Sequence, residues 1–178
     1  KRVRFSDYPE PAVLFSEKRP TDRTKEIGFV SLTQFFTPLD ASAELSYRLY
    51  HDSYGIVSHT VGLSWFQKIG KHVVLSPLFR FTDQSEAKFY ATQFPGDPTL
   101  PADDPFLLHH VPNHYSSDYR LSSLQTFTYG LSALVKFEQR YALDLSYQRY
   151  EMIGLDNVTA SSAYPSANTF SIGFRIWF

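Results

Sequence analysis

The chain has 178 residues, a formal net charge of −1 and no cysteine. This length allows one domain. The lack of cysteine excludes a disulfide scaffold and a thiolate metal site, and the near-zero charge lacks the electrostatic footprint of a nucleic-acid-binding protein. Aromatic residues make up 17% of the chain, beside 11 prolines and one methionine. This composition favours strands and turns over helices.

Residues 1–26 begin the chain with a high density of charge. They hold seven Lys or Arg and five Asp or Glu, together with Pro9, Pro11 and Pro20. Prolines and charges clustered in this way are typical of loops. We therefore predict that 1–26 is an exposed loop leading into the fold.

Seven later segments alternate apolar and polar side chains, the pattern of strands with one apolar face. They are 27–36, 43–50, 60–67, 73–82, 126–137, 141–150 and 170–178. In the last segment, one face is apolar without interruption: Phe170, Ile172, Phe174, Ile176 and Phe178. The segment 126–137 is longer than the five or six residues usual for a strand in a soluble sheet. Such length favours strands that cross a bilayer.

The connections between these segments alternate in length. Short ones at 37–40, 68–72 and 138–140 alternate with longer ones at 51–59, 83–124 and 151–169. Tight turns at one rim and long loops at the other are typical of outer-membrane barrels, whereas a soluble sandwich gives no reason for the alternation. We predict an all-β fold, an antiparallel up-and-down transmembrane β-barrel over 27–178 in a bacterial outer membrane. The short turns and the C-terminus would be periplasmic, and the loops 83–124 and 151–169 extracellular.

The number of predicted strands is odd, whereas bacterial single-chain barrels have an even number. Either residues 2–8 supply a short eighth strand, or this chain is the C-terminal part of a larger barrel. In the second case the remaining barrel strands lie upstream or on another chain. The first residues lack the pattern of a secretory signal peptide, which favours the larger barrel.

Two sets of motifs resemble known proteins. The alternating segment that ends at Phe178 resembles the C-terminal strand that the barrel-assembly machinery reads in Gram-negative outer-membrane proteins. The C-terminal half of a barrel family, domain of unknown function 3570, is similar to LSYRLYHDSYGIVSHT at 45–60, LSPLFRF at 75–81, AKFY at 87–90 and SDYRLS at 117–122. This resemblance implies a barrel longer than the present chain, and it implies no reaction.

The polar faces of the predicted strands offer side chains that would line a barrel lumen. They are Gln34, Glu44, Arg48, Arg80, Lys136, Asp144, Gln148 and Arg175. Asp144 is expected to lie diagonal to Lys136 and opposite Arg175. These residues suit a channel for small solutes or a sheath around a membrane-crossing partner. They suit equally a non-conducting scaffold that holds a plug, a lipoprotein or a cytochrome-like protein, and the sequence leaves both open.

The loop 83–119 has the most distinctive composition in the chain. It carries six acidic residues against Lys88 and holds His109, His110 and His114. Imidazoles beside carboxylates can bind Zn²⁺, Cu²⁺ or Ni²⁺, but Pro112 interrupts any helix that would align two of them. We favour a solvated acidic loop and expect no metal and no cofactor.

A barrel-embedded enzyme is the remaining class. Ser58 and His59 lie close to Asp52 in the sequence, but adjacent residues of a strand point to opposite faces. The sequence contains no nucleophile elbow, phosphate loop or zinc-protease helix motif. We therefore predict that the chain is not an enzyme.

Overall fold

A computed structural model describes residues 1–10, 13–106, 108–137 and 140–177. Within these ranges the fold is all-β, with ten strands, three short 3₁₀ turns and no α-helix. The strands are β1 (Arg2–Phe5), β2 (Phe15–Ser16), β3 (Lys25–Phe36), β4 (Ala41–Asp52), β5 (Val57–Ile69), β6 (Val73–Gln84), β7 (Gln93–Phe94), β8 (Leu124–Phe137), β9 (Tyr141–Gly154) and β10 (Ser166–Ile176). The turns are η1 (Thr37–Leu39), η2 (Tyr119–Leu121) and η3 (Ser161–Ala163).

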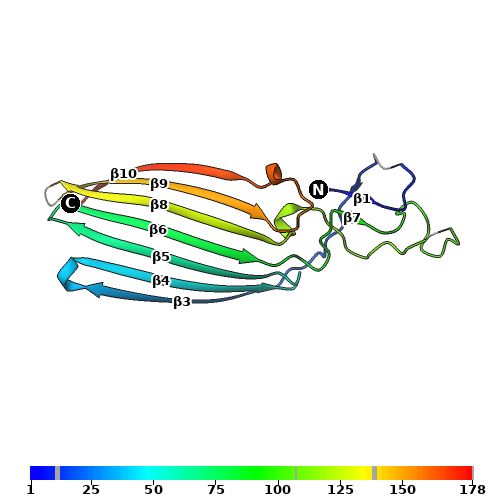
Figure 1. Cartoon of the computed structure of the whole chain (residues 1–178), viewed down its shortest axis with the longest axis horizontal. Coiled ribbons are helices and arrows are strands. Elements are labelled where there is room, and N and C mark those ends of the chain that lie inside the picture. The colour runs from blue at the N-terminus through cyan, green and yellow to red at the C-terminus, as the bar shows by residue number, and fades with distance from the viewer. Residues whose placement is uncertain (11–12, 107, 138–139, 178) are drawn as a thin grey trace.

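Seven strands form the main sheet, in the order β10-β9-β8-β6-β5-β4-β3. Every neighbouring pair is antiparallel, so the chain runs up and down as Figure 1 shows. The seven predicted segments and their order are confirmed, although most strands extend a few residues further. The sheet is not closed into a barrel, because β3 and β10 lie at its two edges.

Local sequence explains how the short turns reverse the chain. Between β3 and β4, Pro38 lies in the first turn of η1, and Asp40 ends it with a left-handed φ of 46°. Between β5 and β6, Gly70 supplies a φ of 60°, which glycine adopts without a Cβ penalty. Pro77 lies inside β6. The pairing of β5 with β6 is interrupted near it, at Trp65 and Phe66 of β5. Proline lacks the N–H that this ladder position needs.

A second, three-stranded sheet in the order β2-β1-β7 lies beyond the long-loop end of the main sheet (Figure 1). We call the described residues of 1–24 and 85–123 the cap. Its core contains the buried side chains of Val3, Phe5 and Phe94, and Phe5 contacts the rings of Phe15 and Tyr115 edge to face. A separate buried cluster joins the cap to the β4–β5 loop: Tyr54, Ile56, Ala87 and Leu121.

The cap corrects two expectations for the beginning of the chain. Residues 1–26 are not simply an exposed loop, because Val3 and Phe5 are among the most buried side chains. Residues 2–8 also supply no eighth strand to the main sheet, since Arg4 and Phe5 pair in parallel with Gln93 and Phe94. The partner strand comes from the long loop that follows β6, about 90 residues away, and no local pattern announces such a pairing. No helix in the described ranges is long and apolar enough to cross a membrane.

Candidate functional site

The register of the main sheet sorts its side chains onto two faces. Directly paired residues point to the same side, and successive residues along a strand point to opposite sides. One continuous row runs from Ser46 through Gly62, Arg80 and Thr128 to Tyr150. We call the face that contains this row the charged face, and the opposite one the apolar face.

Most of the predicted lumen-lining residues share the charged face. They are Glu44, Arg48, Arg80, Lys136, Asp144, Gln148 and Arg175. Gln34 is the exception, because it pairs with Ala43 and therefore lies on the apolar face. The assignment of Gln34 to the same face as the others is wrong. Both faces of β3 carry large apolar side chains, so pairing with β4, and not the β3 sequence, decides which way Gln34 points.

The apolar face is exposed and nearly free of charge. Phe170, Ile172, Phe174 and Ile176 of the predicted assembly signal form one row along β10, and Ile172 is 79% exposed; Phe178 lies outside the described residues. Within the seven strands, the charged residues of this face lie in the half nearer the long loops: Glu26, Asp83, Arg149 and Glu151. A monomeric soluble protein rarely exposes an apolar surface of this extent.

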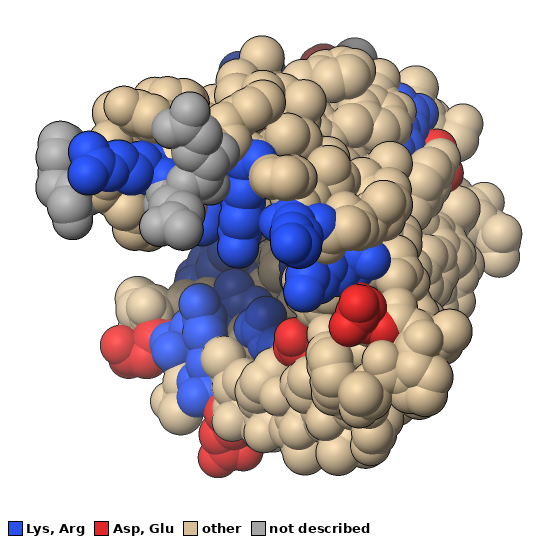
Figure 2. Space-filling view, turned by 90° about the vertical axis from the view of Figure 1, so that its left-hand side faces the viewer, with Lys and Arg blue, Asp and Glu red and all other residues tan. Residues whose placement is uncertain are grey.

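The charged face lines a hollow. Figure 2, which looks at the molecule from the short-turn end, shows Lys and Arg gathered inside a curved wall whose outer surface is mostly uncharged. The pairing register places six basic residues on the charged face: Lys25, Arg48, Lys68, Arg80, Lys136 and Arg175. It places three acidic residues there: Glu44, Asp52 and Asp144. The net charge of this face is therefore +3.

Two acidic residues of the charged face are held by arginine. Asp144 accepts two hydrogen bonds from Arg175, each at 2.6 Å. The two side chains meet across β9 and β10, but diagonally, because the residue directly opposite Asp144 is Gly173. Asp52 is buried and accepts from Nε of Arg23 at 2.8 Å and from the Tyr50 hydroxyl at 2.7 Å. Among the described residues, Lys136 makes no ion pair with Asp144.

Small side chains of β5 lie beside the two central arginines of the charged face, and Phe29 of β3 lies on the other side of Arg48. Arg80 lies beside Gly62, and Arg48 beside Thr60. A Cβ at Gly62 would approach Oγ of Ser46 to 2.6 Å, so a larger residue here would require the Ser46 hydroxyl to rotate away. The row of small residues leaves the long arginine side chains free to extend into the hollow.

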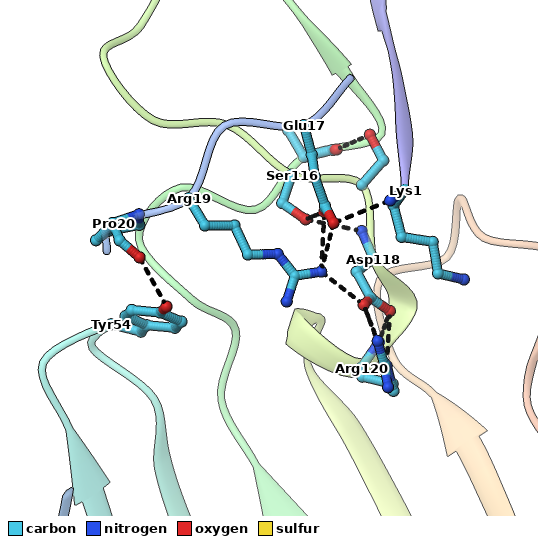
Figure 3. Close-up of polar contacts among 10 residues, drawn as sticks. Lys1, Glu17, Arg19, Pro20, Tyr54, Ser116, Asp118 and Arg120 are labelled. Atoms are coloured by element: carbon cyan, nitrogen blue, oxygen red, sulfur yellow. Dashed lines mark hydrogen bonds and ion pairs between the residues drawn. The ribbon is translucent and has the colours of Figure 1, made fainter. Parts of the chain in front are cut away.

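A network of acidic and basic side chains inside the cap was not predicted from the sequence (Figure 3). Asp118 is fully buried and accepts from Nη2 of Arg120 at 2.6 Å and from Nη2 of Arg19 at 2.8 Å. Arg19 also donates to Glu17 at 2.9 Å, and Ser116 donates its hydroxyl proton to the same carboxylate. The network ties the segment around residue 17 to the segment around residue 118.

The pKa values of the two acids reflect these contacts. Burial alone would raise the pKa of Asp118, but hydrogen bonds from Arg120 and Arg19 outweigh it and hold the pKa well below its usual range. For Glu17, burial again raises the pKa, and the hydrogen bonds from Ser116 and Arg19 reverse the effect and lower it. Both side chains are therefore carboxylates at neutral pH.

The three candidate histidines do not converge. His109 contacts Asp7 through Nδ1 at 2.8 Å, and His114 lies against the Phe89 ring. His110 lines a shallow pocket of about 260 Å³ with Lys18. No group of three His, Asp or Glu side chains in the described ranges is arranged to hold a metal ion.

The candidate triad residues Ser58, His59 and Asp52 are also separated. Ser58 pairs with Gln84 on the charged face, whereas His59 lies on the apolar face and contacts the Tyr47 hydroxyl at 2.6 Å. The Asp52 carboxylate is already occupied by Arg23. The described residues contain no nucleophile–base pair at this position.

The structure is that of an all-β protein whose main element is an open antiparallel sheet. One face of the sheet is charged, the other is apolar, and a small cap lies at one end. The model of the family described as protein of unknown function, DUF3570, matches residues 2–167, and the chain belongs to that family. Comparisons with curated proteins and with solved structures found no match.

Proposed function

We propose that the main sheet is part of the wall of an outer-membrane β-barrel that passes small solutes. The observation that carries the proposal is the separation of charge between the two faces of the sheet. The apolar face would contact lipid, and the charged face would line a water-filled lumen. The short turns would be periplasmic, and the cap would lie outside the cell.

The height of the apolar face agrees with the height of the apolar band of outer-membrane barrels. On β8 its uncharged row runs from Phe127 to Phe137. Ten residues at about 3.4 Å each, tilted by about 40°, span roughly 26 Å along the barrel axis. The apolar band of outer-membrane barrels is about 25 Å tall.

Further strands would have to complete the barrel. The edges of β3 and β10 present unpaired backbone groups, and each such group costs several kcal/mol in lipid. We propose that additional strands, upstream or on another chain, pair with both edges. This chain would then be the C-terminal part of a larger barrel.

A matched pair of substitutions tests the membrane assignment. Leu145 lies on the apolar face, and its neighbour Ser146 lies on the charged face. Placed in lipid, Leu145→Arg should destabilise the folded protein by about 2–4 kcal/mol, whereas Ser146→Arg should cost less than about 1 kcal/mol. Equilibrium unfolding in lipid vesicles measures both. Equal costs, or a protein that stays monomeric and folded without detergent, would contradict the assignment.

Conductance tests the passage of solutes. The protein purified together with the additional strands that close the barrel should produce discrete current steps in KCl when it is inserted into a planar bilayer. The position of the cap at the long-loop end favours one alternative, a non-conducting scaffold or sheath that encloses a partner protein. That alternative predicts a tightly bound partner after purification and no current steps.

A further inference from the structure

Positive charge is concentrated on the charged face, although the chain as a whole is slightly acidic. The charged face carries a net +3, while the apolar face has one basic and three acidic residues and a net −2. The complete chain has a net charge of −1. The net charge of the face that lines the hollow is therefore opposite in sign to the net charge of the whole chain.

Ion pairing makes this bias stronger in the middle of the wall. Arg175 neutralises Asp144, and Arg23 from the cap neutralises Asp52. Among the described residues, no ion pair involves five of the six basic residues of this face: Lys25, Arg48, Lys68, Arg80 and Lys136. Of the acidic residues on this face, this leaves Glu44 alone without a cationic partner in the described part.

Arg48 and Arg80 occupy the centre of the strands, away from both rims. They lie on β4 and β6, about 10 Å apart across the two strand spacings and offset by two residues along the strands, with Gly62 and Thr60 of β5 between them. A wall of low dielectric focuses the field of such charges into the hollow and raises the local concentration of ions of opposite sign. Rings of Arg and Lys are the device by which pores select anions.

We propose that the lumen wall formed by this chain selects small anions, and that Arg48 and Arg80 set the selectivity. This inference rests on the proposed passage of solutes and names the class of solute. The guanidinium groups bind no anion permanently; they raise the anion concentration and lower the cation concentration in the part of the hollow that they face. Chloride and inorganic phosphate are suitable probes.

The experiment measures the reversal potential of the protein, purified with the strands that complete its barrel, in planar bilayers under a KCl gradient. The unmodified protein should be anion-selective. The double substitution Arg48→Gln with Arg80→Gln should reduce the chloride-to-potassium permeability ratio by about threefold to tenfold, as expected for two screened charges close to the ion path. Inorganic phosphate added to one side should reduce the chloride current of the unmodified protein more than that of the double variant.

Two further variants separate selectivity from folding. Arg149→Gln removes a positive charge from the apolar face and should leave the permeability ratio unchanged. Arg48→Lys with Arg80→Lys keeps both charges and should keep the anion preference. If the double glutamine variant does not fold, each single glutamine substitution should give about half of the change on a logarithmic scale.

The outcomes distinguish the two proposals. Current steps with cation preference, or with a ratio that the double glutamine variant leaves unchanged, overturn the selectivity proposal and leave the passage of solutes intact. A protein that inserts into bilayers and gives no current overturns both.

Discussion

The substitution Asp118→Asn would test whether the buried ionic network holds the cap together. Asparagine has the same size and can still accept the backbone N–H of Arg120, but its amide nitrogen replaces the oxygen that accepts from Arg19 and Arg120, so the change removes the charge together with these hydrogen bonds. Loss of one partner from a fully buried ion pair costs about 3–5 kcal/mol. Arg120 is 62% exposed and Arg19 29% exposed, so water can solvate much of the charge that is left behind. We expect the cap to lose about 2–3 kcal/mol.

Hydrogen exchange in the native state measures this loss. Three backbone N–H groups report on the cap, because each crosses between its two segments: Ser6 to Phe94, Lys18 to Tyr115 and Tyr115 to Lys18. A loss of 2–3 kcal/mol should accelerate their exchange by about 30- to 150-fold. The N–H groups of β6 and β8 should exchange at unchanged rates, since the main sheet does not depend on this network.

A matched control is Asp103→Asn, which removes a carboxylate from an exposed position of the same cap segment. It should alter the exchange rates by less than twofold, about the effect expected of an isolated surface charge. The reasoning would be refuted if the two variants exchanged alike. It would also be refuted if Asp118→Asn accelerated the cap and the main sheet equally, because the network would then support the whole fold.

Three further predictions concern acid, the cap core and the wall. Asp118 and Glu17 have lowered pKa values in the folded cap, so their contribution is complete above the usual values of 3.8 and 4.5 and is lost progressively as the pH falls from these values toward the lower folded-state values. Exchange of the same cap N–H groups should therefore accelerate, relative to those of β6 and β8, as the pH is lowered from about 5 to about 3, and an unchanged ratio would contradict this. Phe5→Ala should destabilise the cap by about 3–5 kcal/mol, because the Phe5 ring is buried. Faster hydrogen exchange of the same cap N–H groups would measure this loss, and a cost below about 1 kcal/mol would mean that the cluster around Phe5 is not the core of the cap. Arg175→Gln should leave the free energy of unfolding nearly unchanged, because the Arg175 side chain is exposed in its pair with Asp144; a loss of stability as large as that caused by Phe5→Ala would show a desolvated pair.

The strands of the main sheet are predictable because their signal is local. Each of the segments 126–137 and 141–150 alternates over at least ten residues, and tight turns fix which segments are neighbours. The alternation also places Asp144 and Arg175 on one face of adjacent strands, and the long arginine side chain reaches the carboxylate from the diagonal position. Long elements with strong periodicity need no information from distant parts of the chain.

The cap is not predictable in this way, because its elements are short and its partners are distant. The alternation in β1 covers only Arg2–Phe5, and its parallel partner β7 has two residues. Asp118 is a weak local signal: its carboxylate caps η2 by accepting the N–H of Arg120, as an Asp-x-Arg sequence allows. Nothing local shows that Arg19, 99 residues earlier, completes the contact.

The direction of the two edge strands constrains how the proposed barrel can close. β3 and β10 both run from the long-loop end to the short-turn end, since five antiparallel strands lie between them. Direct pairing of β3 with β10 would therefore be parallel, and two copies of this chain joined edge to edge would contain two parallel seams. An odd number of additional strands closes the wall with antiparallel pairs throughout and gives an even total, as in bacterial single-chain barrels. Strands supplied by one contiguous upstream segment satisfy this condition, and a ring of identical copies does not.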